Sequence, residues 1–203
     1  MIKNIIFDIG NVLGHFCWEK IFHEKLGVDG EVFDKMAKAT TRSNMWNEFD
    51  RSLMSDEEII EGCCNNCPEY ADKIREFFKY VGEVVMDYDY SEEWIKSLKN
   101  RGYRVYILSN YGRTSFNKCL ENGHMGFIKH VDGKLISYEV CKVKPEPEIY
   151  EELLRRFELN PSECVFLDDR AENIAGAEKC GIKGILFTDY EKACQELEKI
   201  LAN

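Results

Sequence analysis

The chain has 203 residues, of which 44% are hydrophobic and 32% charged, as expected for a globular protein with one domain or a core domain carrying an insertion. Its 27 Lys and Arg against 37 Asp and Glu give a net charge of -10, so we expect neither nucleic acid nor an anionic membrane as a partner. A small anionic ligand stays compatible with this charge, because one local basic pocket can hold a phosphate.

Targeting signals and disulfides are not expected. No apolar run approaches the roughly 18 residues needed to span a bilayer, and the N-terminus has no signal or transit pattern, which predicts a cytoplasmic protein. Nine cysteines, several inside apolar patterns, indicate reduced and mostly buried thiols. Cys64 and Cys67 have the C-x-x-C spacing of zinc or redox sites, but Cys63 is their only close companion and no His lies nearby, so we do not favour metal binding there.

The N-terminal part begins with a predicted strand, "NIIF" at 4–7, and is then almost entirely helical. The pair Ser55 and Glu58 has the spacing of a capping box, which marks the start of one helix. Another helix begins behind Pro68 and carries apolar residues at helical spacing. The predicted helices of this part are 17–26, 30–39, 43–50, 55–66 and 69–83.

From about residue 91 onward, strands and helices alternate, which predicts a parallel sheet with helices on both faces. The predicted strands are 103–110, 134–140, 163–169 and 182–187, and the predicted helices are 91–102, 113–122, 142–157, 171–181 and 190–202. We therefore expect a Rossmann-like α/β core domain, residues 1–14 and 89–203. A helical cap domain, residues 15–88, is inserted after the first strand, at the sheet edge where ligands bind.

Polar residues gather where the predicted strands end, and their chemistry suits metal-assisted phosphoryl transfer. The set contains a carboxylate nucleophile, a hydroxyl beside backbone N–H groups, an ammonium group and a pair of acids. Two adjacent carboxylates repel each other unless a cation neutralises them, and Mg²⁺ is the simplest such cation. The residues are Asp8, Ser109 with Asn110, Lys144, and the pair Asp168 and Asp169.

The motifs around these residues resemble those of the haloacid dehalogenase (HAD) superfamily over nearly the whole chain. They are "DIGNV", "SN", "KPEPEIY" and "DDRAENIAGA", in that order. More narrowly, "FDIGNV", "VYILSN" and "VKPEPEIY" are similar to motifs of bacterial sugar-phosphate phosphatases, including those that act on glucose 1-phosphate. The resemblance implies a Mg²⁺-dependent phosphatase that hydrolyses a small phosphate monoester, such as a hexose 1-phosphate, through an aspartyl phosphate.

The resemblance also implies roles for the catalytic residues. Asp8 attacks phosphorus, the Ser109 hydroxyl and the N–H of Asn110 hold the phosphate, and Lys144 neutralises its oxygens.

For the metal, the resemblance implies direct ligation by Asp8, the backbone carbonyl of Gly10 and Asp169, with Asp168 binding directly or through water. Asn173 is a candidate for supporting the water around the ion, although it is equally compatible with an ordinary first-turn residue.

In the predicted cap, the segment "MWNEFDR" at 45–51 contains Trp46 as a candidate substrate contact, with Arg51 and Glu48 as weaker candidates. Helix-face aromatic residues usually belong to the core, so the structural interpretation of Trp46 stays open. His15 lies at the entry to the cap, as a hinge residue or a catalytic group.

Gly10 stands where most phosphatases resembling this one have a general acid, and glycine cannot move a proton. His15, Glu48 or the substrate itself is then left to supply it, or the substrate has a leaving group that departs without help. The anomeric oxygen of a sugar 1-phosphate is such a group. Two alternatives stay open: a 2-haloacid dehalogenase-like hydrolase, and a non-catalytic phosphate-binding relative. Neither the substrate nor the oligomeric state follows from the sequence.

Overall fold

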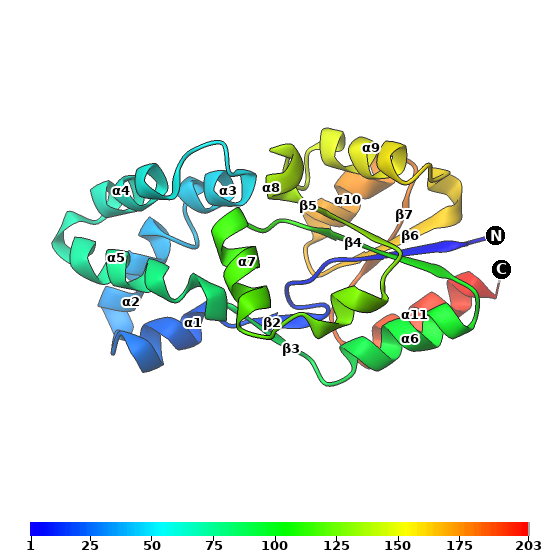
Figure 1. The fold of residues 1–203 in the computed structure, drawn as a ribbon, viewed down its shortest axis with the longest axis horizontal. Coiled ribbons are helices and arrows are strands. Elements are labelled where there is room, and N and C mark those ends of the chain that lie inside the picture. Colours follow the sequence, from blue (N-terminus) through cyan, green and yellow to red (C-terminus); the bar gives the residue numbers. More distant parts are fainter. Residues whose placement is uncertain (203) are drawn as a thin grey trace.

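The computed structural model describes residues 1–202 and is centred on a five-stranded parallel sheet (Figure 1). The strand order is β5-β4-β1-β6-β7, so the first strand of the chain lies in the middle. Parallel pairing throughout confirms the predicted sheet type. The strands are β1 (Asn4–Phe7), β4 (Arg104–Ser109), β5 (Gly133–Ile136), β6 (Cys164–Asp168) and β7 (Lys183–Leu186).

Helices cover both faces of this sheet, because the side chains of its fully buried strands alternate between two apolar clusters. Ile5 and Phe7 of β1 pack with residues of α6 and α11, whereas Ile6 packs with residues of α9 and α10. Figure 1 shows these two pairs of helices on opposite sides of the strands. The Rossmann-like α/β prediction is thus confirmed. The helices are α6 (Ser91–Asn100), α9 (Pro147–Arg156), α10 (Ala171–Lys179) and α11 (Tyr190–Leu201).

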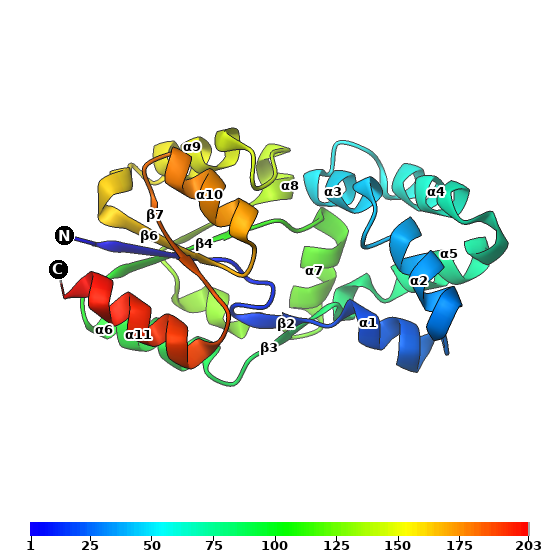
Figure 2. The same ribbon diagram turned by 180° about the vertical axis from the view of Figure 1, so that it is seen from behind.

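A group of helices between β1 and β4 lies beyond one end of the sheet (Figures 1 and 2). Its members include α2 (Gly30–Ala39), α3 (Asn44–Arg51), α4 (Asp56–Asn66) and α5 (Ala71–Lys79). The predicted capping box starts α4: Glu58 N–H donates to Ser55 Oγ at 3.2 Å, and Ser55 N–H donates to the Glu58 carboxylate at 2.8 Å. We retain 15–88 as the proposed cap and 1–14 with 89–203 as the proposed core, whose last residue, Asn203, lies outside the described residues.

Two predicted helices are broken into shorter pieces. Residues 17–26 form α1 (Trp18–Lys20) and then a π-helix, Ile21–Lys25. Residues 69–83 form α5 between two 3₁₀ turns, Pro68–Tyr70 and Val81–Glu83. Apolar spacing shows which residues face the core, but it does not fix the hydrogen-bonding partner of each N–H, so both single-helix predictions were wrong.

A small antiparallel pair, which was not predicted, joins the two ends of the inserted segment: β2 (Gly14–Phe16) and β3 (Val85–Asp87). These strands are too short to show a period. The predicted strand 134–140 was also too long: it ends at Ile136, and Ser137–Val140 forms α8. The remaining helix is α7 (Arg113–Glu121), and Gly126–His130 is a 3₁₀ turn.

The C-x-x-C thiols are buried, and burial raises the pKa of the neighbouring Cys63 to about 12.

Within residues 1–202, no helix has the length and apolar character required to cross a bilayer.

Candidate active site

The parallel sheet gathers three of the predicted acidic residues at one edge. β1 and β6 run in register, with Phe7 beside Leu167, and the N–H of Asp8 donates to the carbonyl of Leu167 at 2.9 Å. Asp8 therefore lies beside the end of β6, which carries Asp168. One carboxylate oxygen from each of Asp8, Asp168 and Asp169 lies within 4.8 Å of the others. The strand-end prediction correctly brought these residues together.

The ammonium group of Lys144 lies between two of these carboxylates. Lys144 Nζ is 2.8 Å from Asp8 Oδ1 and 2.6 Å from Asp168 Oδ2, and the lysine side chain is 1% exposed. Burial acts to lower the pKa of Lys144, but Asp168 and Asp8 outweigh it and the pKa is raised. Lys144 is therefore a permanent positive charge at the base of the site.

Asp8 is buried and held by donors on one oxygen. The Ser109 hydroxyl donates to Asp8 Oδ1 at 2.7 Å. Burial raises the pKa of Asp8 to about 6, even though Lys144 and Ser109 act in the opposite direction. The carboxylate is thus ionised at neutral pH, as a nucleophile must be, while remaining only weakly solvated.

The Asp168 carboxylate is surrounded by donors. Asn173 Nδ2 donates to both of its oxygens, at 2.9 and 3.0 Å, and the N–H of Arg170 donates to Oδ1 at 2.8 Å. Asn173 Oδ1 is buried without a hydrogen-bond partner among the described residues. A buried oxygen without a partner suits a bound water.

Asp169 has fewer contacts than Asp168. Asn11 Nδ2 donates to Asp169 Oδ2 at 2.9 Å, and Asn11 Oδ1 accepts the N–H of Phe16 at 3.1 Å, which connects the cluster to β2. Burial, together with Asp168, raises the pKa of Asp169. The carboxylate oxygens of Asp8, Asp168 and Asp169 are suitable ligands for a hard divalent cation, so the residues present fit Mg²⁺.

The Asn110 side chain forms hydrogen bonds with the backbone of Lys144. Its Nδ2 donates to the carbonyl of Lys144 at 3.0 Å, and its Oδ1 accepts the N–H of Lys144 at 2.8 Å. The side chain therefore fixes the backbone of the lysine loop. A contact from Asn110 to phosphate is left to its main chain, as expected from the sequence.

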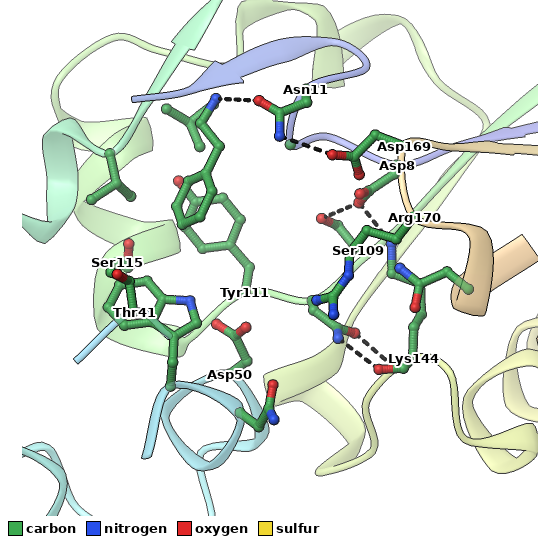
Figure 3. Close-up of a pocket in the computed structure, with 18 of the residues that line it drawn as sticks. Asp8, Asn11, Thr41, Asp50, Ser109, Tyr111, Ser115, Lys144, Asp169 and Arg170 are labelled. Carbon is green, nitrogen blue, oxygen red and sulfur yellow. Dashed lines mark hydrogen bonds and ion pairs between the residues drawn. The ribbon is translucent and has the colours of Figure 1, made fainter. Parts of the chain in front are cut away.

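A cavity of about 280 Å³ opens above these residues (Figure 3). Asp8, Gly10, Ser109 and Lys144 lie on its core side. The inserted segment supplies much of the rest, including Trp46, whose ring centroid lies 6.1 Å from that of Phe16. The other lining residues from this segment are Thr41, Arg42, Ser43, Asn47, Asp50, Val84 and Val85.

Three residues that were predicted as candidate substrate contacts or proton donors lie outside this lining. Arg51 forms a two-pronged ion pair with Glu146, at 2.6 and 2.9 Å, and this contact joins α3 to the loop before α9. Glu48 lies 3.6 Å from Arg51. His15 is exposed, and its ring lies against Tyr88. We therefore do not retain Arg51 as a substrate contact, or Glu48 and His15 as proton donors.

Among the lining residues that sequence reasoning missed are Asn11, Thr41, Asp50 and Arg170. A signal for Asp50 was available, because Ser43, Trp46 and Asp50 are three and four residues apart and share one face of a helix. For Asn11 the signal was weaker: it follows Gly10 directly and has a φ of 56°, a left-handed conformation that asparagine tolerates better than most residues. Thr41 and Arg170 had no comparable signal.

Together, the fold and the site define a Rossmann-like α/β hydrolase with a buried aspartate after its first strand. The chain belongs to the haloacid dehalogenase-like hydrolase family, whose sequence model matches residues 2–181. The expected family and hydrolase class are thereby confirmed.

Two relatives match this chain over nearly its whole length and nearly all of their own. Sesquiterpene phosphatase astK of Aspergillus oryzae is 26% identical over 98% of this chain and 96% of its own. D-ribitol-5-phosphate phosphatase of Bacteroides thetaiotaomicron is 25% identical over 99% of both chains. A crystal structure of a HAD family enzyme from Bacteroides thetaiotaomicron has a TM-score of 0.72 and 21% identity, covering 94% of this chain and 97% of that one. Another structure of that enzyme is a complex with magnesium and inorganic phosphate.

Proposed function

We propose that this protein is a Mg²⁺-dependent phosphatase that hydrolyses a small phosphate monoester. The observation that carries the proposal is the ammonium of Lys144 lying 2.8 Å from Asp8 Oδ1 and 2.6 Å from Asp168 Oδ2, at the base of a cavity of about 280 Å³, a volume that suits one small ligand. The phosphatase names of two full-length relatives and the magnesium and phosphate in a structural neighbour support it.

In this proposal Asp8 attacks phosphorus and forms an aspartyl phosphate, which water then hydrolyses. Ser109 orients Asp8 through its hydroxyl and, with the main chain of Asn110, holds the phosphoryl oxygens. Lys144 neutralises part of the charge on those oxygens.

Asp8, the carbonyl of Gly10 and Asp169 would hold Mg²⁺, with Asp168 contributing directly or through water. When bound, the ion neutralises charge on the phosphoryl oxygens.

The proposed substrate class is a sugar phosphate, such as a hexose 1-phosphate. The cavity wall from the inserted segment combines polar and apolar residues, and Thr41 Oγ1 is buried there with no hydrogen-bond partner among residues 1–202. Such an atom costs free energy unless a ligand or water satisfies it, and a sugar hydroxyl is a suitable partner. Trp46 and Phe16 add the flat apolar surfaces on which sugar rings pack.

The test is a screen of phosphate monoesters with and without Mg²⁺, using wild-type protein and Asp8→Asn. We expect Mg²⁺-dependent release of phosphate from the wild type alone. Equal release by Asp8→Asn would reject the mechanism, and no release from any ester would favour the non-catalytic alternative. A 2-haloacid belongs in the same screen, because turnover of that compound alone would favour the dehalogenase alternative.

A further inference from the structure

Asp50 is a third carboxylate of the cavity lining, beside Asp8 and Asp169, and it comes from the inserted segment. It is the penultimate residue of α3 and is 7% exposed. Figure 3 shows its carboxylate directed into the cavity. Among residues 1–202 it has no ion-pair partner within 4.0 Å. The N–H of Gly112, the residue that precedes α7, lies near its side chain and acts to lower its pKa.

The position of Asp50 is fixed by contacts on both sides. Its backbone carbonyl accepts the Ser137 hydroxyl at 2.6 Å. A Cβ on Gly112 would lie 2.9 Å from both the ring and the carbonyl of Phe49, so only glycine allows α3 to approach α7 this closely. Ser52 Oγ also accepts the N–H of Arg113 at 3.2 Å. Asp50 is therefore held against the core although it belongs to the insertion.

The protonation state of Asp50 suits transfer of a proton near neutral pH. Burial raises its pKa to about 7, although the Gly112 N–H and the charge of Lys144 lower it. The charged groups that act on it across the cavity are Lys144, Asp8 and Arg170. Both forms of the carboxyl group are thus accessible at neutral pH, and proton transfer is most efficient in that range.

The other groups at the base of the cavity are already engaged. Asp8 is the proposed nucleophile, Asp169 is held by Asn11 in the acidic cluster, and Lys144 is paired with two carboxylates. Gly10 has no side chain. Asp50 is therefore the acidic lining residue to which these contacts assign no other role.

We propose that Asp50 is the general acid and base of the reaction, an inference that rests on the proposed phosphatase function. In the first step, a bond forms between Asp8 and phosphorus while the bond to the leaving oxygen breaks, and the Asp50 carboxylic acid gives its proton to that oxygen. In the second step, water attacks phosphorus, the Asp8–phosphorus bond breaks, and the Asp50 carboxylate takes the proton from water. Asp50 ends the cycle protonated, as it began.

The experiment compares wild type, Asp50→Asn and Asp72→Asn on two kinds of ester. Asparagine keeps an acceptor for Gly112 but has no proton to give, and Asp72 is a fully exposed acid on α5 that serves as the matched control. An aryl phosphate has a leaving group that needs no proton, whereas an alkyl phosphate does. We expect Asp50→Asn to lose about 100-fold or more on the alkyl ester, within the range for general acid catalysis, and less than about 10-fold on the aryl ester.

Equal losses on both esters, or no loss on either, would overturn the role of Asp50. These outcomes differ from failure of the proposed function, in which the wild type hydrolyses neither ester. If Asp50→Asn does not fold, measurements on the wild type alone still test the role of Asp50. Its kcat/KM should depend weakly on leaving-group pKa at pH 6 and steeply at pH 9, where Asp50 has no proton to give. The same dependence at both pH values would reject the proposal.

Discussion

Asn110 and Lys144 form two reciprocal hydrogen bonds: the asparagine amide donates to the lysine carbonyl at 3.0 Å and accepts the lysine N–H at 2.8 Å. This pairing joins the end of β4 to the loop before α9, so that the lysine ammonium is presented to Asp8 and Asp168. The position of the charge in the site therefore depends on a residue that does not contact the charge.

Asn110→Ala removes both of these bonds and leaves two backbone groups of Lys144 without partners, a change that costs about 1–3 kcal/mol. We expect kcat to fall by about 10-fold or more while the protein stays folded, as followed by initial rates and by thermal unfolding. Asn122→Ala is the matched control, because Asn122 caps the carbonyl of Gly82 at 3.0 Å, away from the site. Equal effects of the two variants on kcat would contradict the positioning role.

Asp169→Asn removes one charge from the acidic cluster. Because carboxylates are stronger ligands than amides for Mg²⁺, the concentration of Mg²⁺ that gives half-maximal activity should rise by about 10-fold or more. Calorimetric titration of Mg²⁺ into the metal-free variant checks the same point without turnover. Unchanged Mg²⁺ affinity would remove Asp169 from the proposed ligands, and Asp72→Asn again serves as control.

Trp46 and Arg51 should behave differently although both belong to α3. Trp46→Ala changes the cavity wall, so it should alter kcat/KM for sugar phosphates by about 10-fold relative to a small aryl phosphate. Arg51→Met breaks the ion pair with Glu146 that joins α3 to the core, so it should affect both substrates by the same factor. Glu146→Gln should reproduce the Arg51→Met result. A sugar-specific effect of Arg51→Met would restore Arg51 as a substrate contact.

The raised pKa of Asp50, from 3.8 to about 7, predicts a pH dependence. Asp50 loses its proton as pH rises through 7, so wild-type activity on alkyl phosphates should fall above that pH. The free energy of unfolding should also fall as pH rises, because the folded state binds the Asp50 proton more tightly than the unfolded state does. The fall takes place between about pH 4 and pH 7, and this group contributes at most about 4 kcal/mol to it.

Asp50→Asn should remove that part of both pH dependences. Denaturant unfolding of the metal-free variant and wild type at pH 5 and pH 8 measures the stability difference. A difference between the two proteins that does not change with pH would show that Asp50 is ionised in the folded state throughout.

Gly10 can accept a side chain without rearrangement, since a Cβ there would lie 3.8 Å from Phe16 Cβ, an ordinary contact. Gly10→Asp therefore adds a carboxyl group to the lining. In the Asp50→Asn background it should restore part of the activity on alkyl phosphates, measured by phosphate release. Gly10→Ala in the same background fills the space without a proton and should restore nothing. Rescue by both variants would point to packing instead of proton transfer.

The sequence determined the strand ends, and through them the base of the site. Apolar runs that end in Asp8, Ser109 and Asp168 predict neighbouring parallel strands, whose carboxyl ends meet at one edge whatever the details of packing. The capping box at Ser55 and Glu58 was equally readable, because both of its hydrogen bonds lie within four residues. Signals of this kind depend only on local spacing.

Only the tertiary structure showed that Asp50, and not Arg51, faces the cavity. The two are adjacent in the chain, and successive residues of a helix point about 100° apart. Which of them faces the cavity depends on what α3 packs against, namely the N-terminus of α7 and Glu146, and Glu146 lies 95 residues further along the chain. The same holds for the pairing of β2 with β3, which join positions about 70 residues apart. Contacts between such distant segments leave no period in the sequence, so the wall of the cavity was decided by packing.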